Sequence, residues 1–229
     1  MFIDPLYIIM ILPAFALSIY AQIKVKASYS KYSKIPTSSG ISGAKAARMI
    51  LNAEGITDVG IEISRGFLTD HYDPRVKVLR LSERVYMDKS LASVGIAAHE
   101  VGHAIQHARG YLPLMARSAL VPISMLGSNL AWPLLIIGFI FMSKTFITAG
   151  ILFFSLAVLF QIVTLPVEFN ASFRALKALP AAGILSGEEV TGVRHILSSA
   201  AMTYVAAAAT ALLQLLYFLL RAGILGGDE

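Results

Sequence analysis

Residues 99–103 read His-Glu-Val-Gly-His, and this stretch decides how the rest of the chain is interpreted. Two histidines four residues apart project from the same face of a helix, close enough for both imidazoles to bind one zinc ion. Glu100 follows the first histidine, where its carboxylate can take a proton from water and deliver it to a leaving amine. The pattern predicts a peptidase in which His99 and His103 are metal ligands and Glu100 is the catalytic residue.

A small α+β domain is expected around this helix, over residues 24–118. Ser90 is a residue type that caps helix N-termini, and Gly110 is suited to the C-terminal end, so the motif is predicted to lie within one helix. The other expected elements are a helix between Ser42 and Gly55, strands at 61–63 and 76–82, and a turn at 70–74.

The composition is that of a membrane protein. Hydrophobic residues make up 56% of the chain and charged residues only 14%, whereas a soluble domain carries about 25% charged residues. Cysteine is absent, which excludes disulfides and thiolate zinc sites. The first apolar stretch lacks a basic leader and a cleavage site, so it is interpreted as a retained anchor. The four predicted transmembrane spans are 2–23, 120–142, 146–167 and 198–220.

The distribution of lysine and arginine predicts the orientation of these spans. Segment 24–118 contains fourteen of these residues and segment 168–197 three, whereas only Lys144 and Arg221 lie on the other side. Basic residues concentrate in cytoplasmic loops. We therefore expect a multi-pass protein of the cell (inner or plasma) membrane, with both polar segments and the active site facing the cytoplasm.

A catalytic zinc ion needs a third protein ligand in addition to water. His107 is excluded because it lies about 12 Å from His99 along the helix. Glu168 is favoured because the third span should return it to the cytoplasmic face, although an acid there can also simply mark the end of a span. His71 and His195 are the alternatives. His71, Arg174 and His195 are also considered as contacts to the substrate or to the transition state.

Several motifs resemble the bacterial membrane zinc metallopeptidase family typified by YugP. They are the stretches 71–74, 81–86 and 98–106. The sequence Glu-Phe-Asn-Ala-Ser at 168–172 is also similar to the Glu-Phe-x-Ala-Asp element of HtpX-type membrane proteases. By that resemblance Glu168 is the third zinc ligand, as in a gluzincin. Ser172 stands where the element has aspartate, so Asn170 or Ser172 is expected to replace that side chain.

The leading hypothesis is a membrane-bound zinc metalloendopeptidase with one zinc ion per chain, acting on peptide or membrane-protein substrates. The fold class is an α-helical integral membrane protein with a small cytoplasmic gluzincin-like domain. A non-catalytic scaffold or adaptor with a structural metal site is the alternative. Nucleic-acid binding is not expected, because the basic residues are not clustered with stacking aromatics. The oligomeric state is left open.

Overall fold

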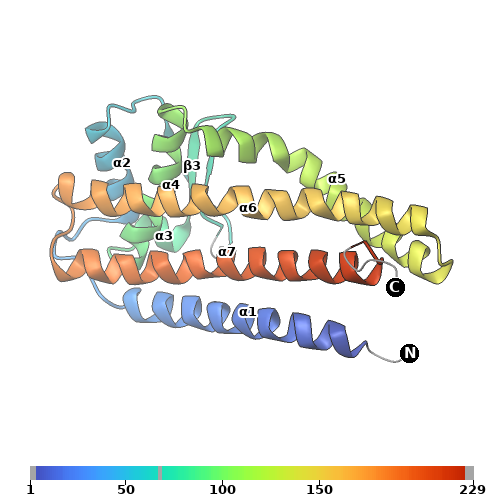
Figure 1. The fold of residues 1–229 in the computed structure, drawn as a ribbon. Helices are drawn as coiled ribbons and strands as arrows, with labels where there is room; N and C mark the ends of the chain where they lie inside the picture. The colour runs from blue at the N-terminus through green and yellow to red at the C-terminus, as the bar shows by residue number, and fades with distance from the viewer. Residues whose placement is uncertain (1–3, 67–68, 225–229) are drawn as a thin grey trace. The chain divides into compact units, whose positions relative to one another are not determined.

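The computed structural model describes residues 4–66 and 69–224. Along the chain the described elements are (Figure 1) α1 (Pro5–Tyr32), α2 (Gly43–Ala53), β1 (Gly60–Ser64), β2 (His71–Asp73), β3 (Val78–Ser82), α3 (Glu83–Met87), α4 (Leu91–Ala108), α5 (Leu112–Ile140), α6 (Lys144–Ala181) and α7 (Glu188–Arg221). The chain divides into two compact units. The helical unit comprises residues 4–21, 116–165 and 203–224, and the mixed unit comprises residues 22–115 and 166–202.

Four of the described helices, α1, α5, α6 and α7, are long and apolar enough to cross a membrane. Between 11 and 28% of each apolar window is buried, so most of these side chains are at least partly exposed, as expected of helices surrounded by lipid. The prediction of four apolar helices is confirmed.

The predicted limits of the spans differ in detail from the helices. Spans 146–167 and 198–220 lie within α6 and α7. Span 120–142 extends two residues past α5, because Met142 adopts a positive φ of 52° in the turn that follows. The first two residues of span 2–23 lie outside the described part of the chain.

Inside the helical unit, polar side chains of α1 and α7 pair with each other. The Tyr7 hydroxyl donates to the Gln214 amide oxygen at 3.2 Å, and the hydroxyls of Ser18 and Thr210 are 3.4 Å apart. Such pairing is needed in hydrocarbon, where no water satisfies a polar group. The α1 and α7 segments of this unit are therefore joined by hydrogen bonds as well as by packing.

The mixed unit is built on a three-stranded sheet of order β1-β3-β2. β3 pairs in parallel with β1 and antiparallel with β2. Leu79 and Leu81 of β3 are fully buried in a core that also contains Ile50 of α2 and Val94 and Val101 of α4. Alternate strand residues share one face of a sheet, so the apolar positions of β3 turn this strand toward the helices. The predicted α+β segment is confirmed in its sheet and its helices.

The turn predicted at 70–74 is wrong for residues 71–73. His71–Asp73 forms β2, whose backbone pairs with β3 from Val78 to Arg80. Tyr72 packs against the core and donates or accepts a 2.8 Å hydrogen bond with His107 Nδ1. Pairing and packing at a distance thus override the turn preference of Asp and Pro, and the chain turns only after Asp73.

Gly102 lets α4 approach the backbone of α6 directly. A Cβ placed on Gly102 would overlap the carbonyl oxygen of Ala171 and lie 2.9 Å from its carbonyl carbon. Only a residue without a side chain fits here. The contact fixes how closely α4 packs on residues 166–181 of α6, and both helices carry side chains of the candidate site.

We predict that Gly102→Ala destabilises the protein by roughly 1–3 kcal/mol, the usual cost of overpacking, although Gly→Ala inside a helix normally stabilises. Thermal unfolding of purified protein in detergent measures the effect. Gly60→Ala is the matched control, because a Cβ there meets Val78 at an ordinary 3.4 Å. Equal melting temperatures for the two variants would contradict the close approach of α4 and α6.

Candidate metal centre

The helix α4 brings His99 and His103 to one face. Its first turn is capped by Ser90, whose hydroxyl accepts a hydrogen bond from the Ser93 backbone N–H, as predicted. The two imidazole centroids are 4.9 Å apart with an interplanar angle of 86°. His103 is buried and His99 is partly exposed, so the pair has one protected side and one side that solvent reaches.

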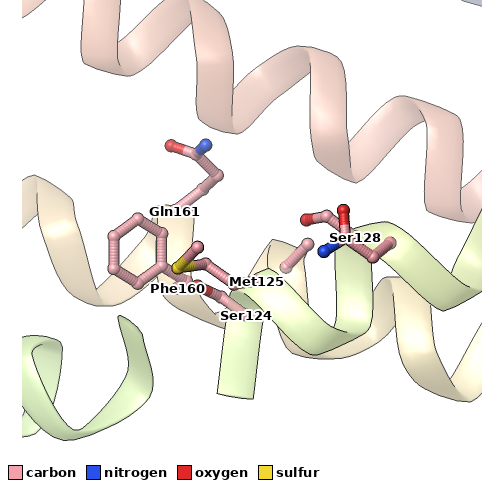
Figure 2. Close-up of a pocket in the computed structure, with 7 residues that line it drawn as sticks. Ser124, Met125, Ser128, Phe160 and Gln161 are labelled. Carbon is pink, nitrogen blue, oxygen red and sulfur yellow. The ribbon is translucent and has the colours of Figure 1, made fainter. Parts of the chain in front are cut away.

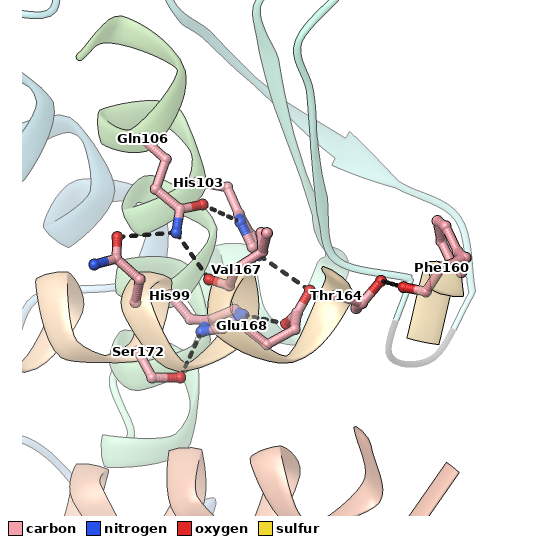
Figure 3. A network of polar contacts seen from close by, with 9 residues as sticks. His99, His103, Gln106, Phe160, Thr164, Val167, Glu168 and Ser172 are labelled. Atoms are coloured by element: carbon pink, nitrogen blue, oxygen red, sulfur yellow. Dashed lines mark hydrogen bonds and ion pairs between the residues drawn. The ribbon is translucent and has the colours of Figure 1, made fainter. Parts of the chain in front are cut away.

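Glu168 of α6 completes a compact set of donor atoms. Its side chain is only 3% exposed, and its carboxylate oxygens lie 3.3 Å from His99 Nε2 and 3.7 Å from His103 Nε2 (Figure 3). Within the described residues, His99, His103 and Glu168 are the one group of three His or acidic side chains suited to hold a metal ion. The sequence expectation that Glu168 reaches the two histidines agrees with this geometry.

The arrangement fits a zinc ion. Zinc–ligand bonds of about 2.0–2.1 Å at tetrahedral angles place ligand atoms roughly 3.3 Å apart. The nitrogen–oxygen distances of 3.3 and 3.7 Å are close to this value. Imidazole nitrogens and a carboxylate oxygen are also the donors that zinc prefers where no thiolate is present. The group can therefore hold one zinc ion without rearrangement of the helices.

A chain of hydrogen bonds orients the His103 ring. The Gln106 amide nitrogen donates to the Val167 carbonyl at 2.8 Å and to Asn170 Oδ1 at 3.0 Å. These two acceptors require the Gln106 oxygen to face His103 Nδ1, 3.0 Å away. Because an amide oxygen only accepts, His103 Nδ1 carries the proton. The lone pair of His103 is thereby left on Nε2, the nitrogen that faces Glu168.

His99 is oriented by a hydroxyl. Ser172 Oγ lies 3.1 Å from His99 Nδ1, where the similar element of HtpX-type proteases has a carboxylate. A hydroxyl can accept the Nδ1 proton and so direct Nε2 toward Glu168. Ser172 thus contacts His99 directly, and Asn170 contacts His103 through Gln106, while the replacement of the aspartate by either residue stays a prediction.

Glu100 is buried beside the metal-binding group. The pKa of its carboxyl is raised to about 7, mainly by burial. The negative charges of Glu168 and Asp70 also raise this pKa, whereas His99 and His71 lower it. A carboxyl that titrates near neutral pH both accepts and returns a proton readily. The environment of Glu100 is therefore suited to proton transfer.

The other three candidate site residues, His71, Arg174 and His195, are not part of the three-residue metal group. His71 is exposed, with Nδ1 2.8 Å from the Thr69 carbonyl oxygen, and its charge acts on Glu100. Arg174 donates through Nε to Asn170 Oδ1 at 2.7 Å and lies over the Tyr111 ring. His195 stacks on Tyr32 and is not in the three-residue metal group of the described chain. Of the three, His71 alone acts on the pKa of Glu100.

Two supporting residues were not predicted as part of the site. Gln106 is fully buried. Its position three residues after His103 could have indicated its contact with that histidine, because residues three apart in a helix are neighbours. Asp70 accepts hydrogen bonds from the Ser82 backbone N–H at 2.7 Å and from its hydroxyl. Its influence on Glu100 depends on the pairing of β2 with β3, which no local pattern predicts.

Comparison with known proteins identifies the family of the chain. Residues 7–223 match the family described as "Putative neutral zinc metallopeptidase". The chain belongs to this family. It is also 46% identical over 215 residues to the "Putative membrane protease YugP" of Bacillus subtilis (strain 168), covering 94% of this chain and 96% of the relative. No solved structure matches the chain. The expected cofactor, zinc, thus agrees with both the family and the donor atoms.

We predict that Glu168→Gln weakens zinc binding at least about 10- to 100-fold, since an amide is a poor zinc ligand and even supporting residues have effects of that size. Competition with a chromogenic chelator measures the affinity. Glu62→Gln is the control, because that carboxylate is 60% exposed and pairs with Arg80. Unchanged affinity in Glu168→Gln would remove Glu168 from the ligand set and leave His71 or His195 as the third ligand.

Proposed function

We propose that this chain is a membrane-bound zinc metalloendopeptidase that hydrolyses peptide bonds at the cytoplasmic face of the cell membrane. The observation that carries the proposal is the approach of Glu168 to both histidines of the His-Glu-x-x-His helix, with Glu100 buried next to them. Two histidines and a more distant glutamate form the ligand set of gluzincins.

Each residue of the site has a separate role in the proposed reaction. His99, His103 and Glu168 would hold a zinc ion, which when bound supplies a Lewis acid that activates water and polarises the scissile carbonyl. Glu100 accepts the proton of the attacking water, holds it on its buried carboxyl and delivers it to the leaving amine. Gln106 and Ser172 keep the histidine rings in the orientation that presents Nε2.

The number of ligands supports catalysis over a structural role. A structural zinc site uses four protein ligands, whereas a catalytic site uses three and leaves one position open. Three suitable side chains converge in the part of the chain that the structure describes. His99 is partly exposed, so the open position has access from outside. These observations favour the peptidase over a scaffold with a structural metal.

Membrane location follows from the family relative and the four apolar helices. The cytoplasmic orientation is our proposal from the excess of basic residues in segments 24–118 and 168–197. We further propose that the substrates are peptides or membrane proteins that present an extended segment at this face of the bilayer.

We predict that Glu100→Gln retains about one zinc ion per chain and loses at least about 100-fold in kcat, since the amide keeps the shape but cannot transfer a proton. Zinc analysis and hydrolysis of a quenched fluorescent peptide library, both on purified protein, are the measurements. Glu83→Gln, on the separate helix α3, is the control. Full turnover by Glu100→Gln would rule out this mechanism.

The orientation is tested by single cysteines, because the natural chain contains none. We predict that a cysteine at Ser39 reacts with an impermeant maleimide only after the cells are permeabilised, whereas one at Ser143 reacts in intact cells. Ser39 is exposed in the mixed unit, and Ser143 lies between α5 and α6. The reverse labelling pattern would place the metal centre outside the cell.

A further inference from the structure

A cleft of about 270 Å³ whose lining includes several polar side chains lies between α5 and α6 in the helical unit (Figure 2). Its lining includes Ser124, Met125, Ser128 and Asn129 of α5 and Phe160 and Gln161 of α6. These residues fall within the spans 120–142 and 146–167. Asn129 is exposed and Gln161 partly exposed, in segments that are otherwise apolar enough to cross a bilayer.

The amides of Asn129 and Gln161 have no hydrogen-bond partner in the part of the chain that the structure describes. Several other polar side chains of the same unit are bonded within it. The Ser124 hydroxyl donates to the Val121 carbonyl at 2.9 Å within its own helix. The Gln214 amide oxygen accepts from Tyr7 of α1. The cleft thus differs from the rest of the unit in presenting amides outward.

The cleft cannot easily close on itself. A Cβ placed on Gly127 would lie only 2.6 Å from the Phe153 carbonyl oxygen, so α5 and α6 are already in backbone contact at this level. Leaving an amide unpaired in hydrocarbon costs several kcal/mol. The partner that satisfies Asn129 and Gln161 must therefore come from another transmembrane helix.

We propose that this partner is a second copy of the chain, which forms a two-fold symmetric dimer through the Asn129–Gln161 cleft. A side-chain amide carries both a donor and an acceptor, so two amides pair with each other through complementary hydrogen bonds. A two-fold interface brings the same surface patch together with itself, which requires such self-complementarity. Met125 and Leu126 are 61% and 54% exposed beside the amides, and they provide apolar side chains to fill the opposite cleft.

A transmembrane helix of a substrate fits the cleft less well. An intact helix has its backbone groups bonded internally, so it offers the amides nothing unless it happens to carry a polar side chain at this depth. A second copy always presents the same two amides in the same membrane. The hydrogen-bonding requirement therefore favours self-association.

The test is the mass of the purified full chain in detergent, measured by light scattering across a dilution series. The wild type is expected to be dimeric. The double variant Asn129→Leu with Gln161→Leu is expected to dissociate at a concentration at least about tenfold higher, as expected for removal of interhelical hydrogen bonds in a membrane. Gln214→Leu is the matched control, because this amide is buried within its own chain, where its oxygen accepts from Tyr7, and it should leave the dimer unchanged.

A cysteine at Ser128 gives an independent measurement in native membranes, because this chain has no other cysteine. Oxidation should join two copies through Ser128→Cys but not through Leu152→Cys, which is 65% exposed on α6 and does not line the cleft. A monomeric wild type without cross-linking would overturn the proposal. So would a dimer that survives the double variant, or cross-linking of the cleft to another membrane protein in place of a second copy.

Discussion

The candidate metal centre depends on the backbone contact between Gly102 of α4 and Ala171 of α6. His99 and His103 flank the glycine in sequence, and Glu168 precedes the alanine by three residues. The absence of a side chain at Gly102 lets the two helices meet closely enough for the Glu168 carboxylate to lie 3.3 Å from His99 Nε2. Even a methyl group there would separate the ligands, since packed interiors do not yield easily.

The same contact brings the supporting residues of α6 to the histidines. Ser172 reaches His99, and Asn170 reaches His103 through Gln106. Arg174 adds to this hydrogen-bond network by donating to Asn170. The proton on His103 Nδ1 is therefore part of a continuous network in which each donor and acceptor is assigned. One short stretch of α6 thus supplies one candidate ligand and orients the two candidate histidine ligands. A buried polar network of this kind is stabilising only when every member is satisfied.

Much of this site could be predicted because its signals are local. Ser90, the two histidines and Gly110 define the α4 helix by spacing and by capping preference, and the four apolar stretches define the long helices. Glu168 is 65 residues from His103, but the alternation of spans and the similarity of its flanking residues indicated its place. The strand at His71–Asp73 and the buried amide of Gln106 were not predicted, because both are defined by contacts with residues distant in sequence. Arg174, considered for the transition state, lies in the network that supports His103.

The central claim is that two imidazoles and one carboxylate bind a zinc ion and leave a position open. X-ray absorption at the zinc edge of the purified protein tests it most directly, because imidazole rings give a distinct multiple-scattering pattern. The account predicts two imidazole nitrogens at about 2.0–2.1 Å with oxygen atoms as the remaining ligands. A third imidazole in the coordination shell would contradict it, since His71 or His195 would then replace Glu168 or close the open position.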